Sequence, residues 1–461
     1  MIQTIRNAWA VPELRKKMLF TVFALLIFRL GSAIPVPYID SQLLAQQLAS
    51  QSGTILGLMN AMSGSAFSMA TIFALSIQPY INSSIIIQLL TVAIPALERL
   101  AKEGGEEGRK KIASITRYAT VAIALIQGFG YYSLIKSYGL INGGSLPGLW
   151  VGIVIVLSFT AGSAFLMWLG EQITEFGIGN GISIILFAGI VSRFPKMVGD
   201  AIRGVNIWNG VQNGTITAET WMSANSRVYD TLEEAQAGLA QAALAPWMIP
   251  IIIIGTLALV VFIVFISNAE RRIPVQYAKR VVGRKMYGGQ STHIPMKVNM
   301  SGVMPIIFAQ SIASLPATIG AFLGWTTANS GMMRLFDTTK PFYSILYFFL
   351  IVGFSYFYAS MTFNPIEVSN NLKKNGGFIP GFRPGKPTAD FITKVLNKIT
   401  MFGALYLSVI AIAPIITGSI FGYNSLAIGG TSVIIVVGVA LETVKQMEAQ
   451  MLMRHYKGFL E

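Results

Sequence analysis

Ten apolar runs, each roughly 20 residues long, recur along this chain with polar stretches between them. A helix of that length crosses about 30 Å of hydrocarbon, whereas strands of a membrane barrel alternate in polarity over about 10 residues. The runs therefore predict an all-α membrane protein. The expected spans lie near residues 18–37, 71–94, 118–135, 149–168, 181–197, 246–267, 302–323, 342–363, 400–420 and 430–447.

The composition agrees with a membrane protein. Of the 461 residues, 53% are hydrophobic and only 12% are charged, which leaves too little polar surface to cover a soluble globule. The basic start, MIQTIRNAWAVPELRKK, precedes an apolar run of full spanning length without a small-residue cleavage pattern. We therefore expect an uncleaved first helix rather than a removable signal peptide.

Basic residues divide unequally between the two sides of this ten-span path. If the N-terminus is cytoplasmic, that side holds 26 Lys and Arg against 13 Asp and Glu, and the other side holds 7 against 7, with Arg29 inside a span. Cytoplasmic segments of membrane proteins carry such a basic excess, so both termini are expected in the cytoplasm. The connection 169–180 is an exception, because it carries Glu171 and Glu175 without a basic residue.

Residues that carry chemistry are scarce. The chain has no Cys, which excludes disulfides and thiolate metal sites, and His293 and His455 are far apart in sequence, so we expect no metal and no cofactor. The glycine cluster at 177–182 follows no predicted strand and lacks a later ribose-binding acid, which argues against a dinucleotide site. No GxxxxGK[ST] motif occurs, so energy for any work must come from a partner or from the membrane potential.

Ionisable side chains are nearly absent at mid-membrane depth, since Arg29 and Glu442 lie toward span ends. The spans carry amides and hydroxyls instead, which form interhelical hydrogen bonds of roughly 0.6 kcal/mol each. Such groups fit either ordinary helix packing or a seam that opens. They are Gln88, Thr91, Gln127, Gln310 and Ser311.

Three other segments have two interpretations each. Residues 52–67 are apolar but too short to cross, so they form either a re-entrant half helix that stoppers an internal vestibule or a helix lying on the outer surface. The long segments 268–301 and 364–399 are rich in Gly, Pro and Arg. They either only set orientation and touch anionic lipid or, as we favour from their length, form a docking surface.

Four stretches together resemble the SecY family, whose members form the central subunit of the bacterial protein-conducting channel. They are PYINSSIIIQLL (79–90), GIGNGISI (177–184), QSTHIPMKVN (290–299) and NGGFIPGFRPGKPT (375–388), in matching order along the ten-span path. Ser76 departs from the family pattern, where Gly is expected, so that local helix packing is in doubt at this position.

The resemblance implies two pseudo-symmetric five-helix halves, residues 1–200 and 246–447, around a central hourglass pore in the cytoplasmic membrane. Residues 201–245 would be an external loop and 448–461 a cytoplasmic tail. An apolar ring at the pore waist would resist wetting without binding any one peptide sequence. By motif the ring falls on Ile81, Ile85, Leu186, Ile190, Ile307 and Ile435, and a movable plug near 57–67 includes Gly57, Asn60, Ser63, Gly64 and Phe67.

The same resemblance places a lateral gate between the second, third, seventh and eighth spans. It implies SecE and SecG subunits, and docking of the SecA motor or the ribosome on the two cytoplasmic segments, with Arg383 the prime candidate. Signal sequences, translocating polypeptides and anionic lipids would be further partners. The docking residues would be Arg271, Arg272, Lys279, Arg280, Arg284, Lys285, Lys373, Lys374, Arg383 and Lys386.

The leading hypothesis is thus a passive channel that passes unfolded polypeptides and releases apolar segments sideways into lipid. The alternative is a secondary transporter for a small solute, which the scarcity of mid-membrane ionisable residues disfavours. An intramembrane enzyme is a third, weaker hypothesis, because no catalytic dyad or metal cluster is found in the sequence.

Overall fold

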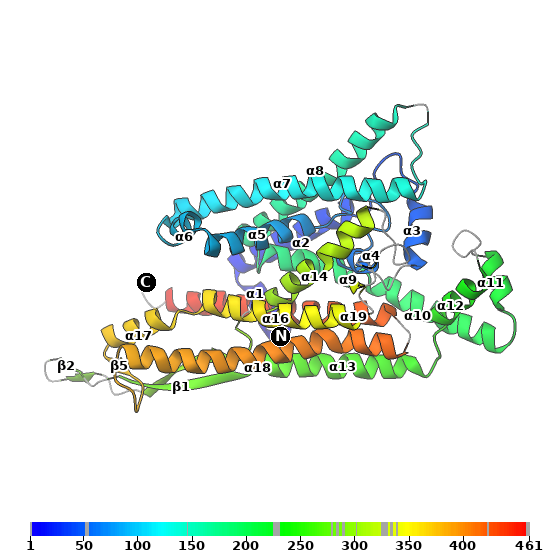
Figure 1. Ribbon diagram of the computed structural model, residues 1–461. Helices are drawn as coiled ribbons and strands as arrows, with labels where there is room; N and C mark the ends of the chain where they lie inside the picture. Colours follow the sequence, from blue (N-terminus) through cyan, green and yellow to red (C-terminus); the bar gives the residue numbers. More distant parts are fainter. Residues whose placement is uncertain are drawn as a thin grey trace.

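In the computed structural model the chain forms a bundle of helices with a small sheet at one end (Figure 1). The structure describes residues 2–457 except 51–54, 145, 225–230, 278–279, 283–284, 288–290, 301, 324–330, 332–334, 338–339 and 422–423. The helices are α1 (Ile2–Ala10), α2 (Pro12–Gly31), α3 (Ser41–Ser50), α4 (Ile55–Met62), α5 (Gln78–Ala93), α6 (Pro95–Lys102), α7 (Gly105–Ser137), α8 (Gly148–Phe176), α9 (Gly181–Val191), α10 (Phe194–Gln212), α11 (Ala218–Ala224), α12 (Leu232–Ala242), α13 (Met248–Ser267), α14 (Met304–Phe322), α16 (Pro341–Thr362), α17 (Pro365–Lys374), α18 (Lys386–Phe421) and α19 (Asn424–Lys457). The strands are β1 (Glu270–Tyr277), β2 (Arg280–Val282), β3 (Lys285–Tyr287), β4 (Ser291–Lys297) and β5 (Gly377–Phe378).

Every expected span overlaps a helix, although some boundaries differ. Among the described residues, seven helical segments are long and apolar enough to cross a membrane, and an eighth is added if α5 and α6, which meet at 104°, form one broken span. Helices α2 and α19 lie at the first and last expected spans. The central α14 has 72% of its apolar window buried inside the protein, whereas α13 has 6% and so faces the surroundings of the bundle. The chain is a multi-pass membrane protein.

The prediction of a helix from residue 71 is wrong, because the chain turns between α4 and α5. Residues 63–77 form turns, and helix α4 ends at Met62 rather than continuing to Phe67. Ser65, Ala70 and Ser76 have positive φ angles, which a right-handed helix does not allow. Apolar composition alone did not reveal these turns, because Ser and Ala fit helices as well as turns in an apolar run.

The polar segments between spans are more regular than expected. Segment 201–245, predicted to be an external loop, includes part of α10 together with α11 and α12. Helix α18 starts at Lys386, inside the predicted docking segment, and α19 continues to Lys457, through most of the predicted tail. Figure 1 shows the strands and α17 at one end of the bundle and α11 and α12 at the other.

The two long segments that were predicted to be cytoplasmic fold together into one body. Strand β1 pairs antiparallel with β4, and its end also pairs with β5, so that Gln276 lies opposite Phe378. This sheet order, β4-β1-β5, joins chain segments about 100 residues apart. A small apolar core lies beneath it, formed by Ile273, Val275, Met296, Leu372, Ile379, Ile392 and Leu396. We call residues 270–297 and 365–399 the cytoplasmic body.

One of the two carboxylates of the acidic connection 169–180 is paired with a neighbouring helix. Arg117 of α7 forms a two-point ion pair with Glu171 of α8, with Nη2–Oε2 and Nε–Oε1 distances of 2.9 and 3.0 Å. Paired charges of this geometry are strong and specific. Although the connection 169–180 has no basic residue of its own, Arg117 of the neighbouring helix α7 supplies a cation for Glu171.

The φ angle of Ser76 gives a stability prediction. Ser76 has φ 52°, lies 2% exposed, and its hydroxyl has no hydrogen-bond partner within the described structure. Replacing Ser76 by Gly removes left-handed strain and a buried unsatisfied group, so we expect a gain of about 1 kcal/mol. The sequence placed only local helix packing in doubt at Ser76. The structure shows instead that the backbone of Ser76 is strained by its positive φ angle.

Thermal unfolding of the detergent-solubilised protein measures the effect. Ser83 is a matched control, because it is fully buried in the interior of α5 and its hydroxyl is hydrogen-bonded to Tyr80 and Thr120. Ser83→Gly should lower the unfolding temperature while Ser76→Gly raises it. A lower temperature for both variants would contradict the strain at Ser76.

Candidate functional site

The six predicted ring residues come from four helices and are all buried. Helix α5 supplies Ile81 and Ile85, α9 supplies Leu186 and Ile190, α14 supplies Ile307 and α19 supplies Ile435. None exceeds 9% exposure, and all six belong to the same hydrophobic cluster of the membrane region. They therefore do not face acyl chains, and helices from both ends of the sequence contribute to one apolar interior.

The glycine cluster GIGNGI positions α9. The Asn180 side chain caps α9 by accepting from the backbone N–H of Ile182 and Ser183 at 3.0 and 3.4 Å. A Cβ on Gly181 would lie 1.8 Å from the carbonyl oxygen of Gly170, so only glycine lets α9 start this close to α8. The cluster therefore sets the place of Leu186 and Ile190, and it has a packing role.

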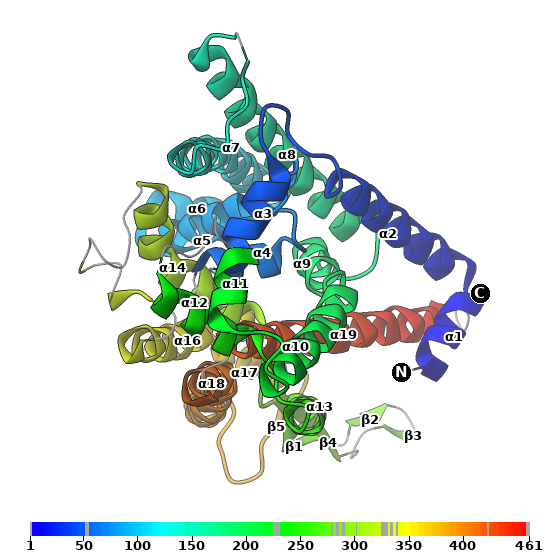
Figure 2. The ribbon, with the colours of Figure 1, turned by 90° about the vertical axis from the view of Figure 1, so that its right-hand side faces the viewer.

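Helix α4 lies among helices that carry the predicted ring residues. It contacts α9, α14 and α19, and Figure 2, a view along the bundle, shows it near the centre. A Cβ on Gly189 would be 2.6 Å from the carbonyl oxygen of Met62, and one on Gly64 would be 2.8 Å from the carbonyl oxygen of Gly189. Two glycines thus bring the backbone of α9 into direct contact with that of residues 55–67, which we call the α4 segment.

Polar side chains stabilise the turn after α4. Asn60 Oδ1 accepts from the Ser68 backbone N–H, and Ser63 Oγ accepts from the Phe67 backbone N–H, both at 3.0 Å. The Tyr131 hydroxyl of α7 donates to the Phe67 carbonyl, and the two rings stack at 4.4 Å. The predicted plug residues therefore form one folded unit that is fixed to α7.

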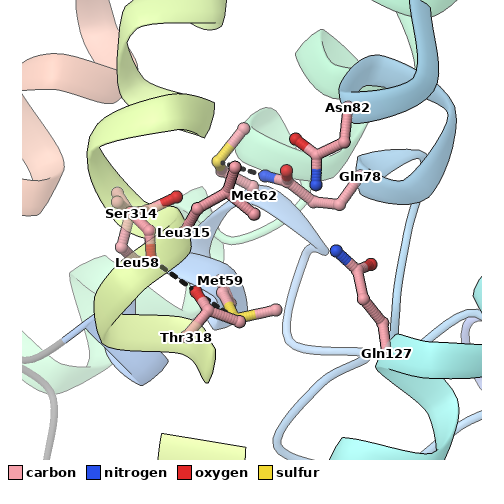
Figure 3. Close-up of a pocket in the computed structure, with 9 residues that line it drawn as sticks. All are labelled: Leu58, Met59, Met62, Gln78, Asn82, Gln127, Ser314, Leu315 and Thr318. Atoms are coloured by element: carbon pink, nitrogen blue, oxygen red, sulfur yellow. Dashed lines mark hydrogen bonds between the residues drawn. The ribbon is translucent and has the colours of Figure 1, made fainter. Parts of the chain in front are cut away.

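A small cavity with both apolar and polar lining residues lies between α4, α5, α7 and α14 (Figure 3). The volume open to a water-sized sphere is about 10 Å³, room for about one molecule. Met62 Sδ of α4 accepts across it from Gln78 Nε2 at 3.1 Å. The Thr318 hydroxyl donates to the Ser314 carbonyl oxygen at 2.8 Å and makes only a long contact of 3.9 Å with Met59 Sδ of α4. Its lining is Leu58, Met59, Met62, Gln78, Asn82, Gln127, Ser314, Leu315 and Thr318.

The cavity leaves polar groups unsatisfied. Asn82 Oδ1 and Gln127 Oε1 have no hydrogen-bond partner within the described residues, and the same holds for Gln310 Oε1 and Ser311 Oγ on α14. A buried amide oxygen without a partner costs about 1–3 kcal/mol. Asn82 and Gln127 thus direct amide oxygens toward the cavity beside α14, and no protein group of the described residues pairs with them.

The five predicted seam residues occupy different places. Gln127 lines the cavity, whereas Gln88 lies further along α5, where its Oε1 accepts from the Tyr358 hydroxyl of α16 at 2.7 Å. Thr91 Oγ1 donates to the Gln88 carbonyl oxygen within α5. Gln310 and Ser311 are buried but do not line the cavity. The structure therefore does not bring the five residues into a single cluster: Gln88 connects α5 with α16, and Gln127 of α7 faces the cavity.

The cytoplasmic body presents several predicted docking residues. Lys373, Lys374, Arg383 and Lys386 are exposed, and Arg271 is exposed on β1. Arg383 stands in a tight turn whose neighbours Gly381 and Gly385 have φ angles of 87° and 104°.

Two hydrogen bonds hold that turn. Thr388 Oγ1 donates to the Arg383 carbonyl oxygen at 2.8 Å, and Ser369 Oγ donates to the Gly385 carbonyl oxygen at 2.7 Å. The backbone of Arg383 is therefore fixed while its side chain remains exposed to solvent.

The other basic residues of the predicted docking set differ. Arg272 is paired with Glu270 through an Nε–Oε1 contact of 2.7 Å, so its charge is partly neutralised. Arg280 and Lys285 belong to β2 and β3. Lys279 and Arg284 lie outside the described residues.

Sequence reasoning missed the residues that connect the α4 segment to its neighbours. Gln78 and Asn82 are one helical turn apart and both precede ring positions, so helical spacing was the available signal. Tyr358 gave no signal, because a Tyr within an aromatic span is ordinary. Gly189 also gave none, since the need for glycine appears only when Met62 is placed against it.

Comparisons with known proteins come from sequence and structure. A family profile described as SecY matches residues 71–444. Protein translocase subunit SecY of Streptomyces coelicolor is 43% identical, with all of both chains covered.

Two solved structures share the fold. One is described as SecY with a plug domain that stabilises the closed state of the translocation channel, and it has a TM-score of 0.59 and 16% identity, with 95% of this chain and 92% of that chain covered. The other, Sec61 in a canine ribosome-channel complex, has a TM-score of 0.54, 16% identity and the same coverage.

The contact between α9 and the α4 segment gives a second prediction. Gly189→Ala places a methyl group against the Met62 carbonyl, which is backbone and cannot rotate away, so α4 must shift from α9. We expect a single cysteine placed at Leu58, a buried position on α4, to react several-fold faster with a water-soluble maleimide in the Gly189→Ala background. Gly199→Ala is the control, since a Cβ there meets nothing within 4 Å. Equal labelling rates in the two backgrounds would show that α4 does not depend on this contact.

Proposed function

Since this chain belongs to the SecY family, we propose that it is a protein-conducting channel that passes unfolded polypeptides across the bacterial cytoplasmic membrane. The observation that carries the proposal is the burial of six aliphatic residues from α5, α9, α14 and α19 in one cluster around α4. We infer a passive channel without catalysis, in which both termini are cytoplasmic. The driving force then comes from a partner.

An aliphatic waist suits a channel whose cargo varies in sequence. Ile and Leu offer no fixed hydrogen-bond donor or charge, so the ring closes around different side chains without retaining any of them. An apolar constriction also dewets, which limits ion leak. Buried positions from both proposed halves, residues 1–200 and 246–447, support this assignment for the ring from Ile81 to Ile435.

The α4 segment is proposed as the plug. It is supported by the contacts of α4 with three ring-bearing helices and by its connection to α5 and α14 through Met62 and Met59. Hydrogen bonds to methionine sulfur are weak, since sulfur is a poor acceptor. Such contacts hold the segment in place and are also readily broken when it leaves.

The lateral gate is proposed along the contacts of α14 with α5 and α7. The unsatisfied amides in this seam and the Tyr358–Gln88 bond between α16 and α5 support it. Lipid then selects what leaves through the gate. A segment with ten leucines gains roughly 5 kcal/mol on entering the bilayer, whereas one central Arg costs about 3 kcal/mol.

The cytoplasmic body is proposed as the docking surface for the SecA motor and the ribosome. Its exposed basic residues suit acidic protein surfaces and RNA phosphates equally. SecE and SecG are proposed as the small membrane subunits that accompany the channel. The nearly uncovered α13 leaves apolar surface for lipid or such a subunit.

Polar substitution in the ring tests the channel proposal. Ile85→Asn or Ile307→Asn should hydrate the waist, because an amide replaces a side chain that is at most 2% exposed. We expect a several-fold larger ion leak in planar bilayers and acceptance of defective signal sequences. Ile86→Asn and Ile319→Asn are controls on the same helices, at positions 44% and 54% exposed. Unchanged conductance in both ring variants would show that Ile85 and Ile307 do not line a pore.

Charge reversal at Arg383 tests the docking surface. Arg383→Glu should reduce SecA-dependent export into membrane vesicles several-fold, because it places a carboxylate where an acidic partner is expected. The amount of inserted protein should not change, since Arg383 is exposed and its turn is held by backbone contacts. Lys394→Glu, at an exposed position on α18 of the same body and outside the predicted docking set, is the matched control for a general charge effect. Normal export by Arg383→Glu would assign docking elsewhere.

A further inference from the structure

Helix α1 packs one face on the far end of the chain. Ala8 is fully buried in a cluster with Leu14, Ile178 and Met447. The Thr4 hydroxyl donates to Glu448 Oε1 of α19 at 3.1 Å. Because Thr4 and Ala8 are one turn apart, they define the face of α1 that α19 covers. The position of this short helix is therefore set by the protein.

A second face of α1 is apolar and exposed. Ile5 and Trp9 are again one turn apart, and they are 42% and 47% exposed. Asn7 lies roughly 200° around the helix from Ile5 and is also exposed. The helix thus has three surfaces, one on α19, one apolar and one polar. This is the arrangement of a helix that lies between water and an apolar phase.

The neighbouring helix shows where this face lies. Val11 is extended, with φ −87° and ψ 117°, and Pro12 opens α2, so α1 ends as a separate helix where the first span begins. Figure 2 shows α1 at the end of α2, beside α19. The exposed cations Arg6, Arg15 and Lys16 surround this junction.

A spanning helix enters the membrane through the headgroup layer, so α1 lies at that level. Trp is enriched at this depth, and clustered cations bind anionic headgroups at about 1 kcal/mol each. The position of α1, its exposed apolar side chains and the nearby cations all indicate that a lipid surface covers this face.

We propose that α1 is an interfacial anchor that inserts Ile5 and Trp9 into the cytoplasmic leaflet, while Arg6, Arg15 and Lys16 bind the phosphates of anionic lipids. The proposal rests on the cytoplasmic placement of the N-terminus given under the proposed function. Because the same helix packs on α19, lipid binding also holds the first and last helices of the bundle together on this side.

The absence of Cys from the chain allows a direct test. Ile5→Cys and Asn7→Cys, each carrying a nitroxide, are reconstituted as the full channel complex in nanodiscs of zwitterionic lipid with and without phosphatidylglycerol. We expect the label at position 5 to be reached by oxygen and shielded from a water-soluble nickel complex, and the label at position 7 to behave in the opposite way. Equal exposure of both labels to nickel in both lipids would overturn the anchor.

Charge and depth are tested separately. The triple variant Arg6→Gln, Arg15→Gln, Lys16→Gln should abolish the added shielding that phosphatidylglycerol gives the label at position 5. Trp9→Ala should place the label at position 5 at a shallower depth in the membrane. If the label at position 5 were shielded only when the small subunits are present, a protein would cover this face and the proposal would be wrong. The depth readout needs no transport, so a failure of the channel proposal leaves it interpretable.

Discussion

The absence of water in the bilayer is the constraint on which this fold depends. Every backbone N–H and C=O there must be satisfied within the protein, and helices do this along the spans. The exception is the turn segment 63–77, which is non-helical yet lies inside the bundle. It is satisfied by its neighbours, since Ile72 N–H donates to Ile34 O and Val36 N–H donates to Ala70 O, both near 3 Å. Irregular backbone is thus confined to a place that other helices cover.

The spans and the membrane location could be predicted because apolar length and charge bias act locally in sequence. The turns at 63–77 could not, since Ser65, Ala70 and Ser76 adopt positive φ without glycine. The pairing of β1 with β5 was also missed. Two short strands about 100 residues apart carry no local signal of their register.

The candidate site was predictable only in part. Ring positions such as Ile85 and Ile307 were placed by resemblance, and their burial is consistent with that placement. The contact of Gly189 with the α4 segment and the bond of Tyr358 to Gln88 of α5 were not found, because both depend on neighbours that only the fold brings near. The position of a residue along its own helix could be predicted, whereas the side chain that it meets on the facing helix could not.

Sheet β4-β1-β5 has a mechanical consequence. Strand β1 follows α13, β4 leads toward α14, and β5 lies between α17 and α18. One sheet therefore connects the ends of the three spanning helices α13, α14 and α18. The linker after β4 is also fixed sideways, because a Cβ on Gly403 of α18 would lie 2.4 Å from the Val298 carbonyl oxygen. Because these contacts connect the segment that carries Arg383 with all three helices, a displacement of that segment would be passed to α13, α14 and α18 together.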